Sequence, residues 1–256
     1  MKVIVPIKMV PNPTFPVRMC REAGTLPQPD LSGIPLVINP FDEIALEAAV
    51  QLRESQMAQQ VIALSIGPES WQGEMRTALA LGADRAIHLV TDARLSPLTL
   101  ARCIRQITLQ EAAQLLLFGR QGVDRDQGIV GPMTAAVLGW GQATFVSQIQ
   151  LEKGVIHVVR EVDGGLESLT LPLPALLTTD LRLNTPRYAS LPNIMKARRK
   201  PLESLLLETF CQTHSIPLLL DQEVLSYQEP PCRPPVTHLQ SVAELARVIQ
   251  EKGVLP

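Results

Sequence analysis

The sequence lacks any pair of cysteines at a spacing that a metal site or a redox motif would use. No CxxC pair and no histidine pair at the interval of a zinc motif occurs, and the four cysteines lie far apart, at Cys20, Cys103, Cys211 and Cys232. This pattern excludes a CxxC motif and the common zinc motifs. We expect four free thiols in a reducing compartment, and no metal.

Long apolar runs are also missing. No stretch approaches the ~20 residues that a membrane-spanning helix needs, and the first apolar run, residues 3–7, is too short for the core of a signal peptide. We therefore expect a cytoplasmic protein, or a protein of the mitochondrial matrix if the source is eukaryotic.

The sequence has neither a strong net charge nor a catalytic motif. The formal net charge is -2 and the pI is near 6.1, so the field of the whole molecule does not attract polyanions and we expect no nucleic-acid partner. No GxSxG, HExxH or Cys/His motif occurs, and the histidines are scattered, at His88, His157, His214 and His238. The sequence predicts a chain that is not an enzyme.

The first 150 residues alternate short apolar runs with longer helical patterns. Hydrophobic residues make up 46% and charged residues 19% of the chain, which is ordinary for a folded soluble protein. The runs and patterns predict strands at residues 3–7, 61–66, 86–90 and 115–118 and helices at residues 40–54, 71–81 and 98–112. Continuous apolar strands between helices favour an α/β fold with a doubly wound, mostly parallel sheet.

The pattern changes in the second half. Residues 143–151 and 155–173 predict an antiparallel hairpin at the sheet edge, with a turn at Gly164 and Gly165, and a strand follows. Residues 184–200 predict a long exposed loop with one helical turn. We assign residues 1–228 to one nucleotide-binding domain that includes this loop, and residues 229–256 to a Pro-rich link and a C-terminal helix at residues 242–252.

Residues 119–131, GRQGVDRDQGIVG, follow a predicted strand and lead into a helix of small residues, where a nucleotide would bind in such a sheet. Glycines let the backbone approach a ligand, a helix start offers amides to a phosphate, and Arg120 or Arg125 could offset the charge of Asp124 and Asp126. The loop is neither GxGxxG nor GxxxxGK(S/T), which argues against a Rossmann dinucleotide site or a P-loop. From the residues alone, a nucleotide site and a plain strand-to-helix turn stay equally open.

Residues 39–42 and 65–68 lie at or near the carboxyl ends of predicted strands and could complete the same pocket. Because Asp42 and Glu43 would repel a phosphate, we place the adenosine part beside them and the phosphate at the glycine loop. The alternative is that Asn39 only caps the helix that begins at Pro40.

A basic run follows three apolar residues inside the predicted loop. The cations are Lys196, Arg198, Arg199 and Lys200, and the apolar residues are Leu191, Ile194 and Met195. Composition alone favours a solvated face. The alternative is an apolar anchor ringed by cations that docks on an acidic partner.

Residues 158–179, VVREVDGGLESLTLPLPALLTT, closely resemble the signature of the electron-transfer flavoprotein β subunit. The next residues, DLRLNTPRYASLPNIMKARRK, resemble that family's partner-recognition loop, and three earlier segments also match: NPFDEIALEAA, RTALALGADRAIHL and DRDQGIVGPMTA. The matches keep their order and spacing and cover nearly the whole chain.

The resemblance implies a heterodimer with an electron-transfer flavoprotein α subunit, which holds most of one FAD, while the β subunit buries a structural AMP. It implies that electrons enter from primary dehydrogenases such as acyl-CoA dehydrogenases and leave to a membrane quinone reductase. Two alternatives stay open: a bifurcating type with a second FAD in place of AMP, and a stand-alone adenine-nucleotide sensor.

The resemblance also implies roles for single residues. Its AMP contacts are Pro6, Asn39, Pro40, Phe41, Asp42, Ile66, Gly119, Arg120, Gln121, Gly122, Val123, Asp124, Arg125, Asp126, Gln127, Gly128, Ile129 and Val130. Glu161 matches a residue at the α-subunit face near the flavin, and Leu191 matches the apolar anchor that dehydrogenases receive. Beside this anchor stand Ile194 and Met195 and a charged collar of Lys196, Arg198, Arg199 and Lys200. The last helix resembles a tail that packs on the α subunit.

Some positions depart from the family pattern. Pro6 stands where alanine is common, and Ile66 where animal members carry cysteine. Residues 10–16 are proline-rich where many relatives have a tyrosine that faces the flavin, which calls that contact into question. Residues 202–220 are more apolar than usual.

Overall fold

The computed structural model describes residues 1–20, 27–152, 154–219, 224–228 and 231–253. The chain divides into two compact units: Met1–Val17 with Leu31–Val224, and Arg18–Asp30 with Leu225–Pro256. Residues 229 and 230 of the expected Pro-rich link lie outside the described residues. Within the described residues, no helix is both long and apolar enough to cross a membrane.

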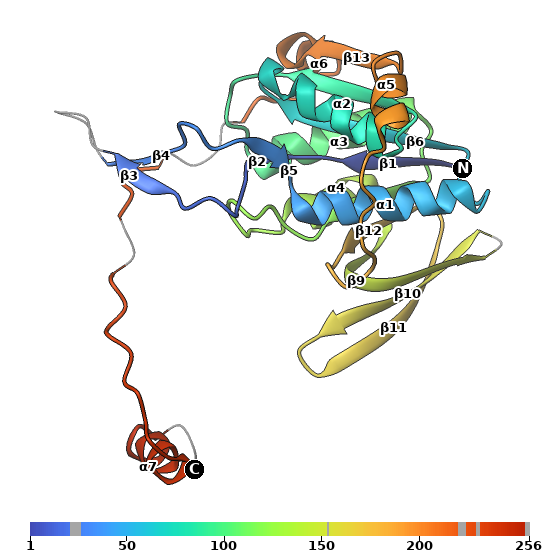
Figure 1. Cartoon of the computed structure of the whole chain (residues 1–256). Helices are drawn as coiled ribbons and strands as arrows, with labels where there is room; N and C mark the ends of the chain where they lie inside the picture. The colour runs from blue at the N-terminus through green and yellow to red at the C-terminus, as the bar shows by residue number, and fades with distance from the viewer. Residues whose placement is uncertain (21–26, 153, 220–223, 229–230, 254–256) are drawn as a thin grey trace. The chain divides into compact units, whose positions relative to one another are not determined.

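The first unit is built on a nine-stranded sheet with the order β11-β10-β9-β12-β8-β1-β6-β7-β13 (Figure 1). All neighbours from β9 to β13 run parallel, whereas β10 is antiparallel to both β9 and β11. The predicted fold class and the hairpin at the sheet edge are therefore confirmed. The strands are β1 (Lys2–Pro6), β6 (Gln60–Gly67), β7 (Arg85–Val90), β8 (Leu115–Gly119), β9 (Gly141–Glu152), β10 (Val155–Val162), β11 (Gly165–Pro172), β12 (Ala175–Thr179) and β13 (Leu202–Leu206).

Helices cover both faces of this sheet. On one face, α1 (Pro40–Glu54) and α2 (Gln72–Leu81) share a core with Val3 and Val5 of β1. On the other face, α3 (Pro97–Gln110), α4 (Val130–Leu138) and α6 (Leu207–Thr213) share a core with Ile4. Successive residues of a strand point to opposite faces, so strands that serve two cores must be apolar throughout.

The helices start where local signals placed them. Helix α1 has the predicted bounds, with Pro40 in its first turn and Asp42 and Glu43 near its positive end. A short 3-10 helix, η1 (Glu69–Trp71), precedes α2. At the start of α3, the hydroxyl of Ser96 accepts the amide of Thr99.

Of the apolar residues 202–220, residue 220 lies outside the described residues, and residues 202–213 form two elements that the sequence analysis did not predict. Strand β13 pairs with β7 along its whole length, and α6 then buries Leu207, Phe210 and Cys211. The Cys211 sulfur lies 3.7 Å from that of Cys103; all four cysteines are free thiols, and burial raises the pKa of Cys103. This segment therefore covers one end of the second core.

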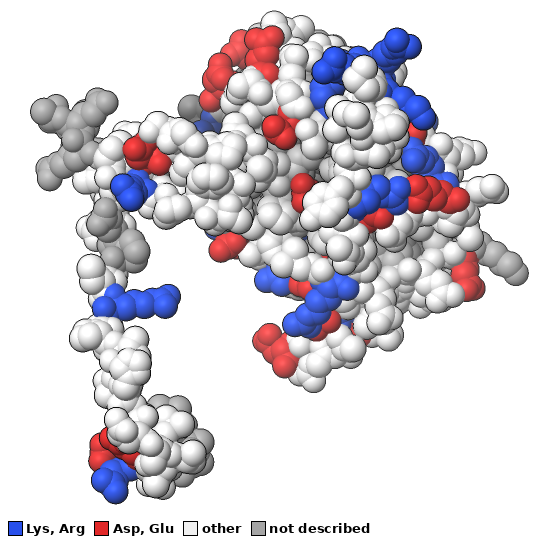
Figure 2. Space-filling model, in the orientation of Figure 1, with Lys and Arg blue, Asp and Glu red and all other residues white. Residues whose placement is uncertain are grey.

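Residues 184–200 hold more regular structure than the single helical turn we expected. Helix α5 (Leu191–Ala197) has seven residues, and the Ser190 hydroxyl accepts the amide of Asn193 at its start. On its inner side Ala197 is buried. Figure 2 shows lysine and arginine side chains gathered over the region where α5 lies in Figure 1.

Two short strand pairs and one more helix complete the structure. In the first unit, β2 (Met9–Pro11) pairs with β5 (Leu36–Ile38). In the second unit, β3 (Arg18–Cys20) pairs with β4 (Gln28–Asp30). The second unit also contains α7 (Val242–Glu251), which ends one residue before the predicted position and starts at a Ser241 cap.

Two adjacent leucines test the contribution of α6. Leu207 is 1% exposed and Leu206 is 66% exposed. We predict that Leu207→Ala lowers the free energy of unfolding by about 2–5 kcal/mol because it leaves a cavity in the core, whereas Leu206→Ala changes it by less than ~0.5 kcal/mol. Urea unfolding followed by circular dichroism measures both. Equal effects would contradict a structural role for this segment.

Candidate nucleotide site and docking helix

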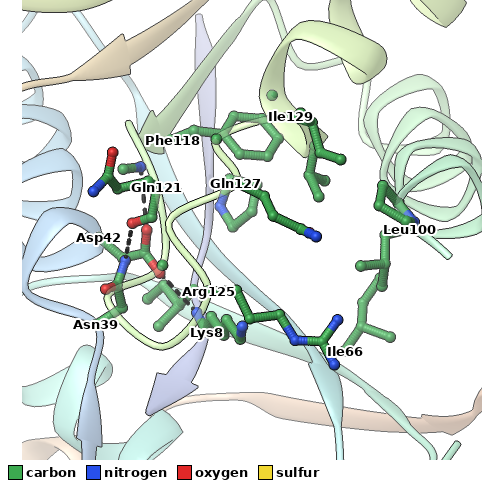
Figure 3. A pocket seen from close by; sticks show the side chains of 18 of the residues that line it. Lys8, Asn39, Asp42, Ile66, Leu100, Phe118, Gln121, Arg125, Gln127 and Ile129 are labelled. Carbon is green, nitrogen blue, oxygen red and sulfur yellow. Dashed lines mark hydrogen bonds between the residues drawn. The ribbon is translucent and has the colours of Figure 1, made fainter. Parts of the chain in front are cut away.

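A cavity of about 210 Å³ opens at the carboxyl edge of the sheet, where β1, β6 and β8 end (Figure 3). This is the edge at which open α/β sheets bind ligands. The glycine-rich loop between β8 and α4 forms one wall, and residues of β6 and α3 form another. The loop is therefore placed where the sequence analysis put a nucleotide.

Most of the predicted AMP contacts line this cavity. They are Pro6, Asn39, Asp42, Ile66, Gly119, Arg120, Gln121, Gly122, Asp124, Arg125, Gln127, Gly128, Ile129 and Val130. Four others, Pro40, Phe41, Val123 and Asp126, are not in its wall. Of residues 65–68, only Ile66 reaches the cavity.

Sequence reasoning missed nine other residues of the wall. The missed residues are Ile7, Lys8, Leu64, Trp71, Leu95, Pro97, Leu100, Ile104 and Phe118. Pro97, Leu100 and Ile104 belong to α3, whose apolar pattern indicates a helix that faces the core and does not indicate a ligand site. Lys8 had a usable signal, since it stands two residues after the last residue of β1, at the edge where ligands bind.

Asp42 joins three elements at the floor of the site. Its Oδ2 accepts the amide of Lys8 at 2.8 Å, and its Oδ1 accepts the amide of Gly119 at 3.1 Å. Burial raises the pKa of Asp42 to about 7, although both backbone bonds and the side chain of Asn39 act to lower it. The start of α1 is thus tied to the segments that leave β1 and β8.

Asn39 is not the side-chain cap that we considered, because α1 has no side-chain capping bond. Its Nδ2 donates to the Gln121 carbonyl at 2.8 Å, and its Oδ1 accepts the Val123 amide at 3.2 Å. The Asn39 side chain has both a donor and an acceptor, so it can bond to a carbonyl and to an amide of the loop at the same time. Asn39 therefore holds the glycine-rich loop in shape.

Gly119 allows this close approach. A Cβ at this position would lie 2.3 Å from Oδ1 of Asp42 and 2.7 Å from the backbone of Phe41. Any larger residue would push α1 away from the end of β8. This glycine is required by packing, independently of any ligand.

The charges near the loop include a pair that we did not expect. Lys8 meets Asp124, with Nζ 2.7 Å from Oδ1. Arg120 bonds to Asp180 at 2.7 Å and lies over the Phe41 and Phe145 rings, so it does not offset Asp124 or Asp126. Oδ1 of Asp126 accepts from Gln121.

The cavity has a polar and an apolar side. In Figure 3, Asn39, Asp42 and Lys8 lie on one side, Ile66 and Leu100 lie on the other, and the Arg125 side chain extends between them. The polar groups of Asn39 and Asp42 are bonded to backbone groups of the loop. The apolar surface of the cavity comes from residues of β6 and α3. The placement of the adenosine part beside residues 39–42 stays a prediction, and the apolar side offers a second position for it.

The predicted docking residues lie on α5 and just after it. Leu191 is 74% exposed, and Ile194 and Met195 are 40% and 55% exposed. Lys196, Arg198 and Arg199 are also exposed. A helix that presents leucine, isoleucine and methionine to solvent beside three cations has the composition of a docking surface.

Lys200 departs from the collar in which we placed it. Its Nζ donates to the carbonyls of Leu79 and Ala83 at 2.9 and 2.6 Å. These carbonyls belong to the C-terminal end of α2 and the residues after it, where a cation is favoured. Lys200 therefore has a structural partner, whereas the other three cations point outward.

Glu161 lies on β10 and forms an ion pair with Arg182. Its side chain is 26% exposed. Its predicted place at the face of a partner subunit stays a prediction. Among the described residues, no group of three Cys, His, Asp or Glu side chains could hold a metal ion.

A family model described as "Electron transfer flavoprotein domain" matches residues 31–208. The chain is 41% identical to "Electron transfer flavoprotein subunit beta" of Bradyrhizobium diazoefficiens, over 100% of both chains. The chain belongs to the electron transfer flavoprotein β-subunit family. The mitochondrial subunit beta of Arabidopsis thaliana is 43% identical over 96% of both chains. The "Electron transfer flavoprotein subunit beta" of Sus scrofa is 43% identical over 87% of this chain and 88% of its own. The resemblance on which the sequence analysis relied is confirmed.

The raised pKa of Asp42 predicts a pH effect. Its pKa rises from 3.8 to about 7 on folding, so its contribution to stability is full below pH ~4 and is lost as the pH rises through ~7. Asp42→Asn cannot titrate. We predict that wild type loses stability relative to this variant between pH 5 and 7, by up to about 1.4 kcal/mol per pH unit.

Urea unfolding at pH 5, 6, 7 and 8 tests this effect. The amide also places a donor opposite a backbone donor, which adds a destabilisation that does not depend on pH. Parallel pH profiles for the two proteins would show that Asp42 titrates with an ordinary pKa.

Proposed function

We propose that this chain is the β subunit of a heterodimeric electron transfer flavoprotein. In this proposal it holds a structural AMP, helps to enclose the FAD held by an α subunit, and docks primary dehydrogenases such as acyl-CoA dehydrogenases. Electrons then pass onward to a membrane quinone reductase. The chain acts as a carrier subunit without catalytic residues of its own. The cavity at the glycine-rich loop is the observation that carries the proposal.

The two sides of the cavity suit the two ends of AMP. Apolar side chains of β6 and α3, such as Ile66 and Leu100, offer contact area to the adenine ring. The phosphate belongs at the loop, near the amides at the start of α4 and the cations of Lys8 and Arg125. A lysine paired with Asp124 can turn to a phosphate dianion, since its ammonium rotates freely on a flexible stem.

In this proposal the cavity holds AMP rather than a second FAD, and the redox-active flavin belongs to the α subunit. The FAD of the α subunit supplies the redox chemistry by accepting and returning electrons. This chain contributes position, by covering one side of the partner's site and by presenting α5 to donors.

Nucleotide release tests the proposal. The heterodimer is denatured by heat, and the released nucleotides are separated by chromatography. We expect one AMP and one FAD per heterodimer. Two FAD would support the bifurcating alternative, and a stable monomer with no flavin-bearing partner would support the nucleotide sensor.

Lys8→Met in the same assay tests the phosphate position. Loss of a charged hydrogen bond, about 1.5–3 kcal/mol, should lower AMP affinity about tenfold or more and leave substoichiometric AMP. Lys2→Met is the matched control. Lys2 stands at the start of β1, pairs with Glu111, and is not part of the cavity wall. Equal AMP content in both variants would remove Lys8 from the site.

Leu191→Ala tests docking. We expect the KM of an acyl-CoA dehydrogenase for the heterodimer to rise about tenfold or more, as for a central interface residue, with unchanged FAD and AMP content. Leu109→Ala, at a leucine on α3 that is 49% exposed, should have no effect. An unchanged KM for Leu191→Ala would contradict the docking role.

A further inference from the structure

The segment that leads into α5 is fixed to the surface of α1 by Arg187 and, three residues earlier, by Asn184, whose Nδ2 donates to the Ile44 carbonyl at 3.0 Å. Arg187 Nε donates to Oε2 of Glu47 at 2.7 Å, and its Nη2 donates to Oε1 at 2.9 Å. The same guanidinium reaches Glu54, with Nη1 2.6 Å from Oε1 and Nη2 2.9 Å from Oε2. Its backbone amide also donates to Glu47. One arginine thus uses its fork on two carboxylates about two helical turns apart on α1.

This contact is more than an exposed ion pair. The Glu47 side chain is 6% exposed, and burial alone would raise its pKa, but bonds from Arg187 and Gln51 outweigh burial and lower it. Bonds from Arg187 likewise lower the pKa of Glu54. Both carboxylates are therefore charged at neutral pH, and the guanidinium is held from two directions.

The other end of α5 is fixed to α2. Arg76 Nη1 donates to the carbonyls of Ala197 and Lys200, at 3.0 and 2.7 Å. Lys200 closes the C-terminal end of α2 as described above. The short helix is thus held between two sets of bonds, while its outer residues, among them Leu191, stay exposed.

Of these two sets of bonds, the set formed by Arg187 lies nearer to Leu191 along the chain. Only three residues separate it from Leu191, so the exposed leucine lies at most ~14 Å along the chain from a fixed point. A segment ordered before binding loses less conformational entropy when a partner closes on it. Without Arg187, the residues between Asn184 and the first turn of α5 would be held by fewer bonds and would lose more conformational entropy on docking.

We propose that Arg187 is a positioning residue, which acts through Leu191 by fixing the orientation of α5 for the electron-donating dehydrogenase. This inference rests on the proposed docking function. It assigns a role to a residue that contacts neither the nucleotide cavity nor the exposed face of α5.

Arg187→Met tests this role in the full heterodimer, with steady-state reduction by an acyl-CoA dehydrogenase as the assay. We expect KM to rise about three- to tenfold, which is typical for coupled positions, with kcat within about twofold of wild type. AMP content, FAD content and reduction by dithionite should not change. Arg187→Lys should restore only part of the loss, because lysine cannot form the fork.

Arg85→Met is the matched control. Arg85 also reaches two carboxylates, those of Glu111 and Glu203, and its side chain is 21% exposed against 34% for Arg187. It lies at the start of β7 and contacts neither α5 nor the segment before it. We expect this variant to lose stability to a similar extent while its KM stays unchanged.

A double-mutant cycle separates positioning from general stability. If Arg187 acts through Leu191, Arg187→Met added to Leu191→Ala should raise KM no further, whereas independent effects would multiply. Should Arg187→Met fail to assemble, Glu54→Gln provides the same cycle with a smaller effect, since it removes one of the two carboxylates.

The outcomes distinguish the two proposals. A normal KM for Leu191→Ala would overturn the docking function and this inference with it. A raised KM for Leu191→Ala with a normal KM for Arg187→Met would overturn positioning alone. Independent effects in the cycle, or an equal KM increase in Arg85→Met, would reduce Arg187 to a structural residue.

Discussion

The carboxylate of Asp42 is the interaction on which the rest of the site depends. Parallel strands end with backbone amides that the sheet no longer pairs, and a buried amide without a partner costs free energy. Asp42 accepts the amides of Lys8 and Gly119, so the chain segments that leave β1 and β8 are closed against the start of α1. These two donors reduce the cost of burying the carboxyl group, although burial still raises its pKa to about 7.

The shape of the cavity follows from that junction. Once α1 lies against the end of β8, Asn39 can reach across to the loop and hold it at Gln121 and Val123. In this conformation of the loop, Asp124 lies next to Lys8. Residues of β6 and α3 form the apolar side of the cavity. A polar floor opposite an apolar wall is thus a consequence of how three strand ends meet.

Patterns in the sequence predicted the elements whose structure depends on interactions between residues close in sequence. Helix α1 has the predicted bounds because proline, acidic first turn and apolar spacing all agree. Strand β13 was not predicted, because its residues LESLL pair with β7, far earlier in the chain. The position of Lys8 just after β1 could have been read from the sequence, but its pairing with Asp124, which is distant in sequence, could not. Asn39 was interpreted as a cap because its position fits both roles, and only the folded loop decides between them.

Helix α1 connects the nucleotide cavity with the docking segment. Its N-terminal end holds Asn39 and Asp42 at the cavity floor, and its outer face holds Glu47 and Glu54 under Arg187. A ligand that binds only the folded protein stabilises the elements that form its site. In the proposed function, AMP therefore stabilises the helix on which the docking segment rests. A nucleotide can support electron transfer in this way without taking part in redox chemistry.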